Sequence, residues 1–159
     1  GSLGHGLGMA AGLALAAKLD GKDYLSVALM GDGECYEGSV WESAMFAAHH
    51  GLGNLVAIVD RNRQITLDFT EDANHLEPFS QKWQSFGWEA CELDGHSFEE
   101  IFAAWTRVRQ RGSNQPVVLI ANTTKGKGIS FMEGQLKWHH NVPKGEQLEI
   151  AKKELAVDG

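Results

Sequence analysis

Two short apolar runs, each followed at once by polar residues, constrain this chain most. Residues 25–30 and 55–59 are mostly aliphatic and only five or six residues long, which is typical of buried strands. Gly31, Asp32 and Gly33 follow the first run, and Asn62 follows the second. The carboxyl ends of parallel strands share one edge of a sheet, where open α/β sheets bind ligands. We therefore expect Asp32 and Asn62 on neighbouring loops of a ligand site.

The residue types at this edge indicate a metal and a phosphate group. Carboxylate and amide oxygens suit Mg²⁺, which fills its remaining positions with phosphate oxygens and water. Gly31 and Gly33 would let the backbone approach a phosphate and point amide hydrogens at it. Together they predict a magnesium-bridged diphosphate. A tight turn with a capping Asp and an unrelated loop Asn is the alternative.

The rest of the chain alternates helical and strand patterns. Helices are predicted over residues 9–19, from Ser39 to about His50, over 78–86, from Ser97 to Val108 and over 146–156; further strands are predicted over 88–93 and 116–121, and a loop over 65–78. Ser39 with Glu42, and Ser97 with Glu100, have the spacing of capping boxes. The apolar stripe from Phe98 to Val108 should pack against the sheet. This alternation predicts a single α/β domain over 1–159 with a mostly parallel sheet and helices on both faces.

Composition excludes several classes of function. The net charge is −7 and no basic cluster is present, so we expect no nucleic-acid partner. Cys35 and Cys91 have no framework spacing, which favours free thiols in a reducing compartment. No run of 18 apolar residues and no leader pattern are present, so we expect no membrane partner and a cytoplasmic protein.

Three further segments are candidates for ligand contact. The glycine-rich residues 1–8 favour a close backbone approach to a flat ligand, or a flexible terminus before a packed helix. Lys125 and Lys127 lie among glycines after the strand at 116–121, which suits an anion or an ordinary solvated turn; we choose Lys125 for the diphosphate. His139 and His140 lie shortly before Pro143, and they are either site residues or a pair of surface histidines.

The motifs resemble those of one enzyme family. Gly31-Asp-Gly33, a spacer of 28 residues and Asn62 resemble the thiamin diphosphate signature. The flanking text as far as Gln64, together with the segment from Trp138 to Pro143, resembles the transketolase family in its split, two-subunit form. The resemblance implies the diphosphate-binding domain of a thiamin diphosphate enzyme that moves a two-carbon ketol unit from a ketose to an aldose.

The resemblance also implies roles for individual residues. Mg²⁺ would be held by the Asp32 and Asn62 side chains and the Gln64 carbonyl. Cofactor contacts would come from Gly1, Leu3, Gly31, Asp32, Gly33, Glu34, Asn62, Ile65, Lys125 and His139. His139 matches the family's catalytic histidine, with His140 standing where that family has Gly. Glu37 would link two active sites across a subunit interface.

The implied enzyme needs a second domain. The family's pyrimidine-binding domain, which brings the activating carboxylate, is not recognisable here, so we expect a partner subunit with a pyrimidine domain, a homo- or hetero-oligomer, and sugar or sugar-phosphate substrates. The family also has a long upstream region, so the chain looks truncated at its amino terminus. A deoxyxylulose-phosphate synthase, an α-type subunit of a 2-oxoacid dehydrogenase, or a non-catalytic magnesium–diphosphate module are the alternatives.

Overall fold

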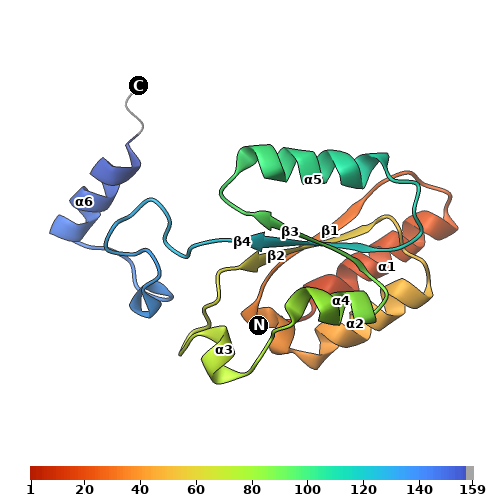
Figure 1. The fold of residues 1–159 in the computed structure, drawn as a ribbon, viewed down its shortest axis with the longest axis horizontal. Helices are drawn as coiled ribbons and strands as arrows, with labels where there is room; N and C mark the ends of the chain where they lie inside the picture. The colour runs from red at the N-terminus through yellow and green to blue at the C-terminus, as the bar shows by residue number, and fades with distance from the viewer. Residues whose placement is uncertain (157–159) are drawn as a thin grey trace.

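A four-stranded parallel sheet forms the centre of the protein. The computed structural model describes residues 1–156. The strands are β1 (Ser26–Gly31), β2 (Leu55–Arg61), β3 (Glu89–Asp94) and β4 (Val117–Asn122). They lie in the order β1-β2-β4-β3, and every neighbouring pair is parallel (Figure 1). The predicted parallel sheet is confirmed, and its four carboxyl ends meet at one edge.

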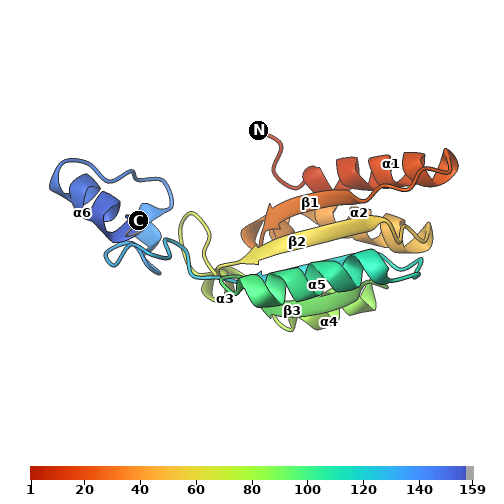
Figure 2. The same ribbon diagram turned by 90° about the horizontal axis from the view of Figure 1, so that it is seen from above.

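Helices cover both faces of the sheet, as predicted. α1 (Gly6–Leu19), α2 (Gly38–His49) and α4 (Phe79–Ser85) lie on one face, and α5 (Phe98–Gln110) lies on the other (Figures 1 and 2). α1 and α2 approach each other closely, because a Cβ on Gly8 would lie 3.0 Å from the Ser43 hydroxyl. The Ser39 hydroxyl donates to the Gly4 carbonyl, so the segment before α1 is fixed against the start of α2.

Side chains alternate between two apolar clusters along the strands. Ala57 and Val59 face the larger cluster under α1, α2 and α4, whereas Val56 faces the smaller cluster under α5. Burial of this kind contributes roughly 25 cal/mol per Å² of apolar surface. On β1, Val27 and Leu29 are exposed on the α5 side. α5 therefore covers only part of its face.

The predicted stripe on α5 is only partly correct. Val108 is buried and Trp105 packs against the smaller cluster, but Phe98 is 78% exposed and Phe102 is 67% exposed. The helix contacts the sheet chiefly at β3, so its outer aromatic residues have nothing to pack against within the described chain. Periodicity identified the helix but not the width of the surface beneath it.

The helix starts also differ in detail from the predictions. Ser97 accepts a hydrogen bond from the Glu100 amide at 3.3 Å, but Glu100 accepts from the Asp94 amide, so only half of that capping box forms. The Ser39 box is wrong, because α2 begins at Gly38 and the Ser39 hydroxyl donates to the Gly4 carbonyl at 2.9 Å. The predicted loop at 65–78 contains one helical turn, α3 (Thr70–Ala73).

The last part of the chain extends beyond the carboxyl edge of the sheet. It holds a 3₁₀ turn at Leu136–Trp138 and α6 (Glu146–Leu155), which lies apart from the sheet in both views (Figures 1 and 2). The segment folds on itself, since Glu154 accepts hydrogen bonds from the amide and hydroxyl of Ser130 at 2.7 and 2.6 Å. None of the helices in residues 1–156 is long and apolar enough to cross a lipid bilayer.

Candidate functional site

A cavity of about 470 Å³ opens at the carboxyl edge of β1, β2 and β4. It is lined by Leu3, Gly31, Asp32, Gly33, Glu34, Tyr36, Glu37, Asp60, Asn62, Gln64, Ile65, Thr66, Leu67, Lys125 and His139. Five separate stretches of the chain thus contribute to it. Of the candidate site residues, only Gly1 and His140 do not line this cavity.

Asp32 lies at the end of β1 and is 1% exposed. Its Oδ1 accepts a hydrogen bond from the Gly33 amide at 2.8 Å, because Asp32 caps the 3₁₀ turn Gly33–Tyr36. Its Oδ2 accepts from the Arg63 amide at 2.6 Å and from the Arg61 guanidinium at 2.9 Å. Arg63 reaches this position with φ of 63°, a strained backbone for a residue other than glycine. Oδ1 therefore keeps more acceptor capacity than Oδ2.

Asn62 is held in one orientation after β2. Its Oδ1 accepts from the Gln64 amide at 3.0 Å, and its Nδ2 donates to the Asp60 carboxylate at 3.1 Å. The other Asp60 oxygen accepts a hydrogen bond from Thr123, at the end of β4. Asp60 thus fixes which end of the amide is the oxygen, and it ties the β2 and β4 ends together.

Gln64 supplies two oxygens without partners. The residue is 5% exposed, yet its Oε1 has no hydrogen-bond partner. Neighbouring backbone bonds join Ile65 to Asp68 and Thr70 to Arg63, so within residues 1–156 the Gln64 carbonyl accepts none. A buried oxygen without a donor is costly, and a bound cation or water would satisfy it.

The donor set fits a hard cation that keeps part of its shell from a ligand. Among the described residues, no three His, Cys, Asp or Glu side chains gather to hold a metal. The site instead offers one carboxylate, one side-chain amide oxygen and a free carbonyl. Mg²⁺ is commonly bound in this way, by one or two carboxylates with phosphate oxygens and water completing six positions.

Glycines form the walls on both sides of Asp32. A Cβ on Gly33 would lie 2.5 Å from Ile65 Cγ2, so the two loops touch where the first has no side chain. Gly4 has φ of 81°, and a Cβ there would lie 2.5 Å from Glu37 Cβ. The Gly4 amide donates to Glu34 at 2.9 Å. The amino-terminal segment is therefore fixed against the 3₁₀ turn Gly33–Tyr36 and the residue that follows it.

Lys125 and His139 reach the cavity from the carboxyl-terminal part of the chain. His139 Nε2 lies 3.4 Å from the Thr66 hydroxyl, and its Nδ1 is buried without a partner. Burial, reinforced by the nearby charge of Lys125, lowers the pKa of His139. The imidazole is therefore neutral near pH 7, and its Nε2 makes only a long contact with the Thr66 hydroxyl.

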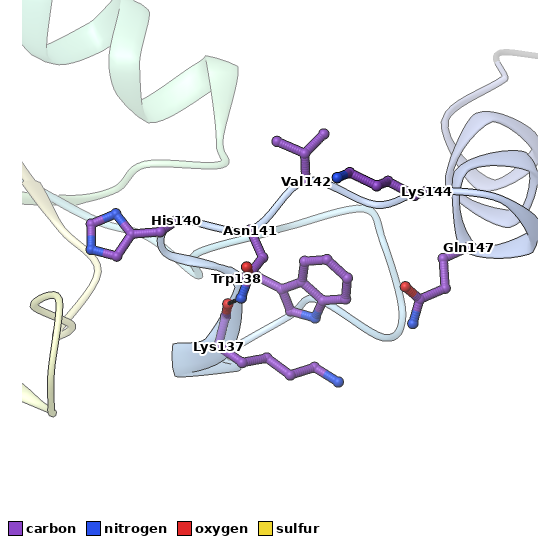
Figure 3. A pocket seen from close by; sticks show the side chains of 7 residues that line it. All are labelled: Lys137, Trp138, His140, Asn141, Val142, Lys144 and Gln147. Carbon is purple, nitrogen blue, oxygen red and sulfur yellow. Dashed lines mark hydrogen bonds between the residues drawn. The ribbon is translucent and has the colours of Figure 1, made fainter.

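The structure distinguishes the two histidines. His140 is exposed and lines a separate pocket with Lys137, Trp138, Asn141, Val142, Lys144 and Gln147 (Figure 3). Its imidazole extends to one side of this pocket, away from α6. The sequence left both histidines as candidates because His140 stands where the resembling family has Gly.

Sequence reasoning missed Arg61, Asp60 and Thr123. Arg61 and Asp60 hydrogen-bond to Asp32 and Asn62 respectively, and Thr123 hydrogen-bonds to Asp60. Arg61 is 1% exposed although it is charged. The only signal was its place between Asp60 and Asn62 at the end of an apolar run, which fits a solvated loop equally well. No pattern in the sequence indicates that its partners lie at Glu71 and Glu77.

Fold and site together define an α/β protein with a cavity at the carboxyl edge of a parallel sheet, lined by oxygen donors and one lysine. The family model "Transketolase, thiamine diphosphate binding domain" matches residues 1–159. The chain belongs to the transketolase family, as part of its thiamine diphosphate-binding domain.

Curated relatives agree with this assignment. The chain is 46% identical over 156 residues to one subunit of the apulose-4-phosphate transketolase of Phocaeicola vulgatus, covering 98% of this chain and 55% of that protein. It is 40% identical over 159 residues to the 6-deoxy-6-sulfo-D-fructose transketolase subunit SqwG of Clostridium sp., covering 100% and 58%. The chain therefore spans about half the length of these relatives.

Solved structures show the same fold. The transketolase of Campylobacter jejuni superposes with a TM-score of 0.87 at 31% identity, covering 97% of this chain and 25% of that one. The predicted family and fold class are confirmed.

Proposed function

We propose that this chain binds thiamin diphosphate with Mg²⁺ and acts as the diphosphate-binding half of a split transketolase. The single observation that carries the proposal is the cavity that unites Asp32, Asn62, Gln64, Lys125 and His139 at one sheet edge. The buried Asp32 carboxylate, the Asn62 amide oxygen and the Gln64 carbonyl lie there beside the one lysine of the lining, which suits a cation and an anion bound together.

Each residue has a role that its contacts support. Asp32 Oδ1, Asn62 Oδ1 and the Gln64 carbonyl would hold the metal, and Lys125 would neutralise a phosphate oxygen. Gly31 and Gly33 line the cavity, and without side chains they would let the backbone lie close to the diphosphate. When bound, thiamin diphosphate supplies the carbanion-stabilising chemistry of two-carbon transfer.

His139 would act on the substrate side of the site. Its lowered pKa keeps the imidazole neutral, so it can accept or donate one proton at a hydroxyl oxygen of a sugar held beside the cofactor. A positioned acid or base of this kind contributes roughly 10²–10⁴-fold to a rate. Leu3, Ile65 and Leu67 provide the apolar side of the cavity. Leu3 and Leu67 are largely exposed in this chain, so a partner that covers them would exclude water from the reacting centre.

The proposed activity needs a partner. The relatives from Phocaeicola vulgatus and Actinobacillus succinogenes are named as subunits of a transketolase, which supports a second protein that would bring the pyrimidine-binding domain. Glu37 is exposed at the rim of the cavity, where it would meet that partner. The proposed substrates are a ketose donor and an aldose acceptor, or their phosphates.

The test is a ketol-transfer assay on the full chain mixed with a pyrimidine-domain subunit of a split transketolase, with Mg²⁺ and thiamin diphosphate. We expect turnover in the mixture and none from either component alone. Asp32→Ala should abolish turnover. Asp72→Ala is the matched control, because Asp72 is an exposed carboxylate on α3 outside the cavity. Robust turnover by the chain alone, or by the Asp32 variant, would contradict the proposal.

A further inference from the structure

The most unusual group among the described residues is the buried guanidinium of Arg61. It lies at the last position of β2 and is 1% exposed. Its NH1 donates to Asp32 Oδ2 at 2.9 Å and to the Thr70 hydroxyl at 2.8 Å. Its NH2 donates to Glu71 at 2.9 Å and Glu77 at 2.8 Å. The guanidinium carbon lies 5.4 Å from the centre of the Phe79 ring.

We propose that Arg61 is a positioning residue that fixes Asp32 so that only Oδ1 is offered to the metal. This inference rests on the proposed function, and it adds a residue that contacts neither metal nor cofactor. Oδ2 receives two donors, from Arg61 and the Arg63 amide, whereas Oδ1 receives only the Gly33 amide. A carboxylate held in this way binds a cation through one oxygen at a defined place.

A buried cation beside a metal ligand would ordinarily weaken the metal site. The two glutamates remove this difficulty, because three carboxylates surround the one guanidinium. Glu71 and Glu77 balance the charge of Arg61 from the side away from the cavity. Asp32 therefore keeps its negative charge for the metal while its orientation is fixed.

The same cluster joins three segments that carry the site. Arg61 connects Asp32 after β1, the end of β2, and the stretch from Thr70 to Glu77. The Tyr36 hydroxyl donates to the Thr70 carbonyl at 2.5 Å and strengthens this connection. Lysine could not replace Arg61, because a single ammonium lacks the planar fork that reaches acceptors on two sides.

The experiment measures Mn²⁺ affinity by electron paramagnetic resonance, with Mn²⁺ as the probe for the Mg²⁺ site and the full chain at saturating thiamin diphosphate. Changes to groups that orient metal ligands typically cost 10–100-fold in metal affinity, so we expect Arg61→Met and Arg61→Lys each to weaken Mn²⁺ binding by about 10–100-fold. Glu77→Gln removes the balancing charge and keeps only one of the two hydrogen bonds that the carboxylate accepts, from Arg61 and the Phe79 amide. This variant should weaken Mn²⁺ binding by about two- to fivefold. Arg107→Met is the control, because Arg107 is an exposed arginine paired with Glu89 on another part of the sheet.

The outcomes separate this inference from the proposed function. Parent-like Mn²⁺ affinity in a folded Arg61→Met protein, or full rescue by Arg61→Lys, overturns the positioning role. If Arg61→Met fails to fold, Glu77→Gln decides, since its side chain is 54% exposed and the variant should fold; unchanged affinity there also overturns the inference. A parent chain that binds no Mn²⁺ overturns the proposed function itself, and the inference with it.

Discussion

Replacing Lys125 by Met should weaken thiamin diphosphate binding by about 10–100-fold. Lys125 is the only Lys or Arg among the described residues that line the cavity, and it shares that lining with Asp32, Glu34, Glu37 and Asp60. An anionic diphosphate entering so acidic a cavity depends on the metal and on this one ammonium group. A hydrogen bond to a charged group contributes roughly 1.5–3 kcal/mol, and 1.4 kcal/mol corresponds to about tenfold in affinity.

The assay is a calorimetric titration of thiamin diphosphate into each variant at saturating Mg²⁺, in low and high salt. Lys127→Met is the matched control, because Lys127 lies two residues further on, is exposed, and pairs with Glu133 at 3.4 Å outside the cavity. The loss should shrink in high salt, which screens the attraction between exposed charges. Equal affinities for the parent and the Lys125 variant, or equal losses in both variants, would refute the reasoning.

Three further changes test other parts of the structure. Gly4→Ala should lower the free energy of unfolding by at least about 1–2 kcal/mol, because Gly4 has a left-handed backbone, and it should also weaken cofactor binding. Gly6→Ala should do neither, because a Cβ there meets nothing within 4 Å. Chemical denaturation checks the stability of both variants, and calorimetry checks their cofactor binding. His139→Asn should lower kcat far more than His140→Asn, because only His139 lines the cavity, and comparable losses would contradict this. The hydrogen bond from Arg61 lowers the pKa of Glu77 most, and the one from the Phe79 amide lowers it further. The ionised Glu77 side chain therefore contributes to stability above its unfolded pKa of about 4.3, and this contribution is lost as the pH falls through the lower folded pKa. Urea unfolding should therefore show a larger free energy of unfolding for the parent than for Glu77→Gln at pH 7, and the difference should disappear in acid. A difference that does not depend on pH would contradict this prediction.

The sequence predicted the parts of the fold that depend on local patterns. Short apolar runs identified β1, β2 and β4, and β3 was predicted over the less apolar residues 88–93. The polar residues that follow β1 and β2 placed Asp32 and Asn62 at one edge, because parallel strands share that edge. Lys125 and Leu3 line the same cavity, and their contact with a cofactor stays a prediction.

The remaining features depend on contacts between distant segments. Arg61 could not be recognised as buried, because its partners Glu71 and Glu77 lie in a stretch without periodicity, where the four-residue helix α3 was also missed. Phe98 belongs to an apolar stripe at helical spacing, yet it is exposed. The sequence could not predict this, because a periodic pattern does not say how far the opposing surface extends.

The most direct test of the central claim is whether thiamin diphosphate binding depends on Mg²⁺ and on Asp32. Calorimetry would compare the parent with Asp32→Asn, which keeps the shape of the side chain, in the presence and absence of Mg²⁺ and with a pyrimidine-domain partner present throughout. The account predicts tight binding only for the parent with Mg²⁺. Binding that is equally tight without the metal, or in the Asp32 variant, would contradict it.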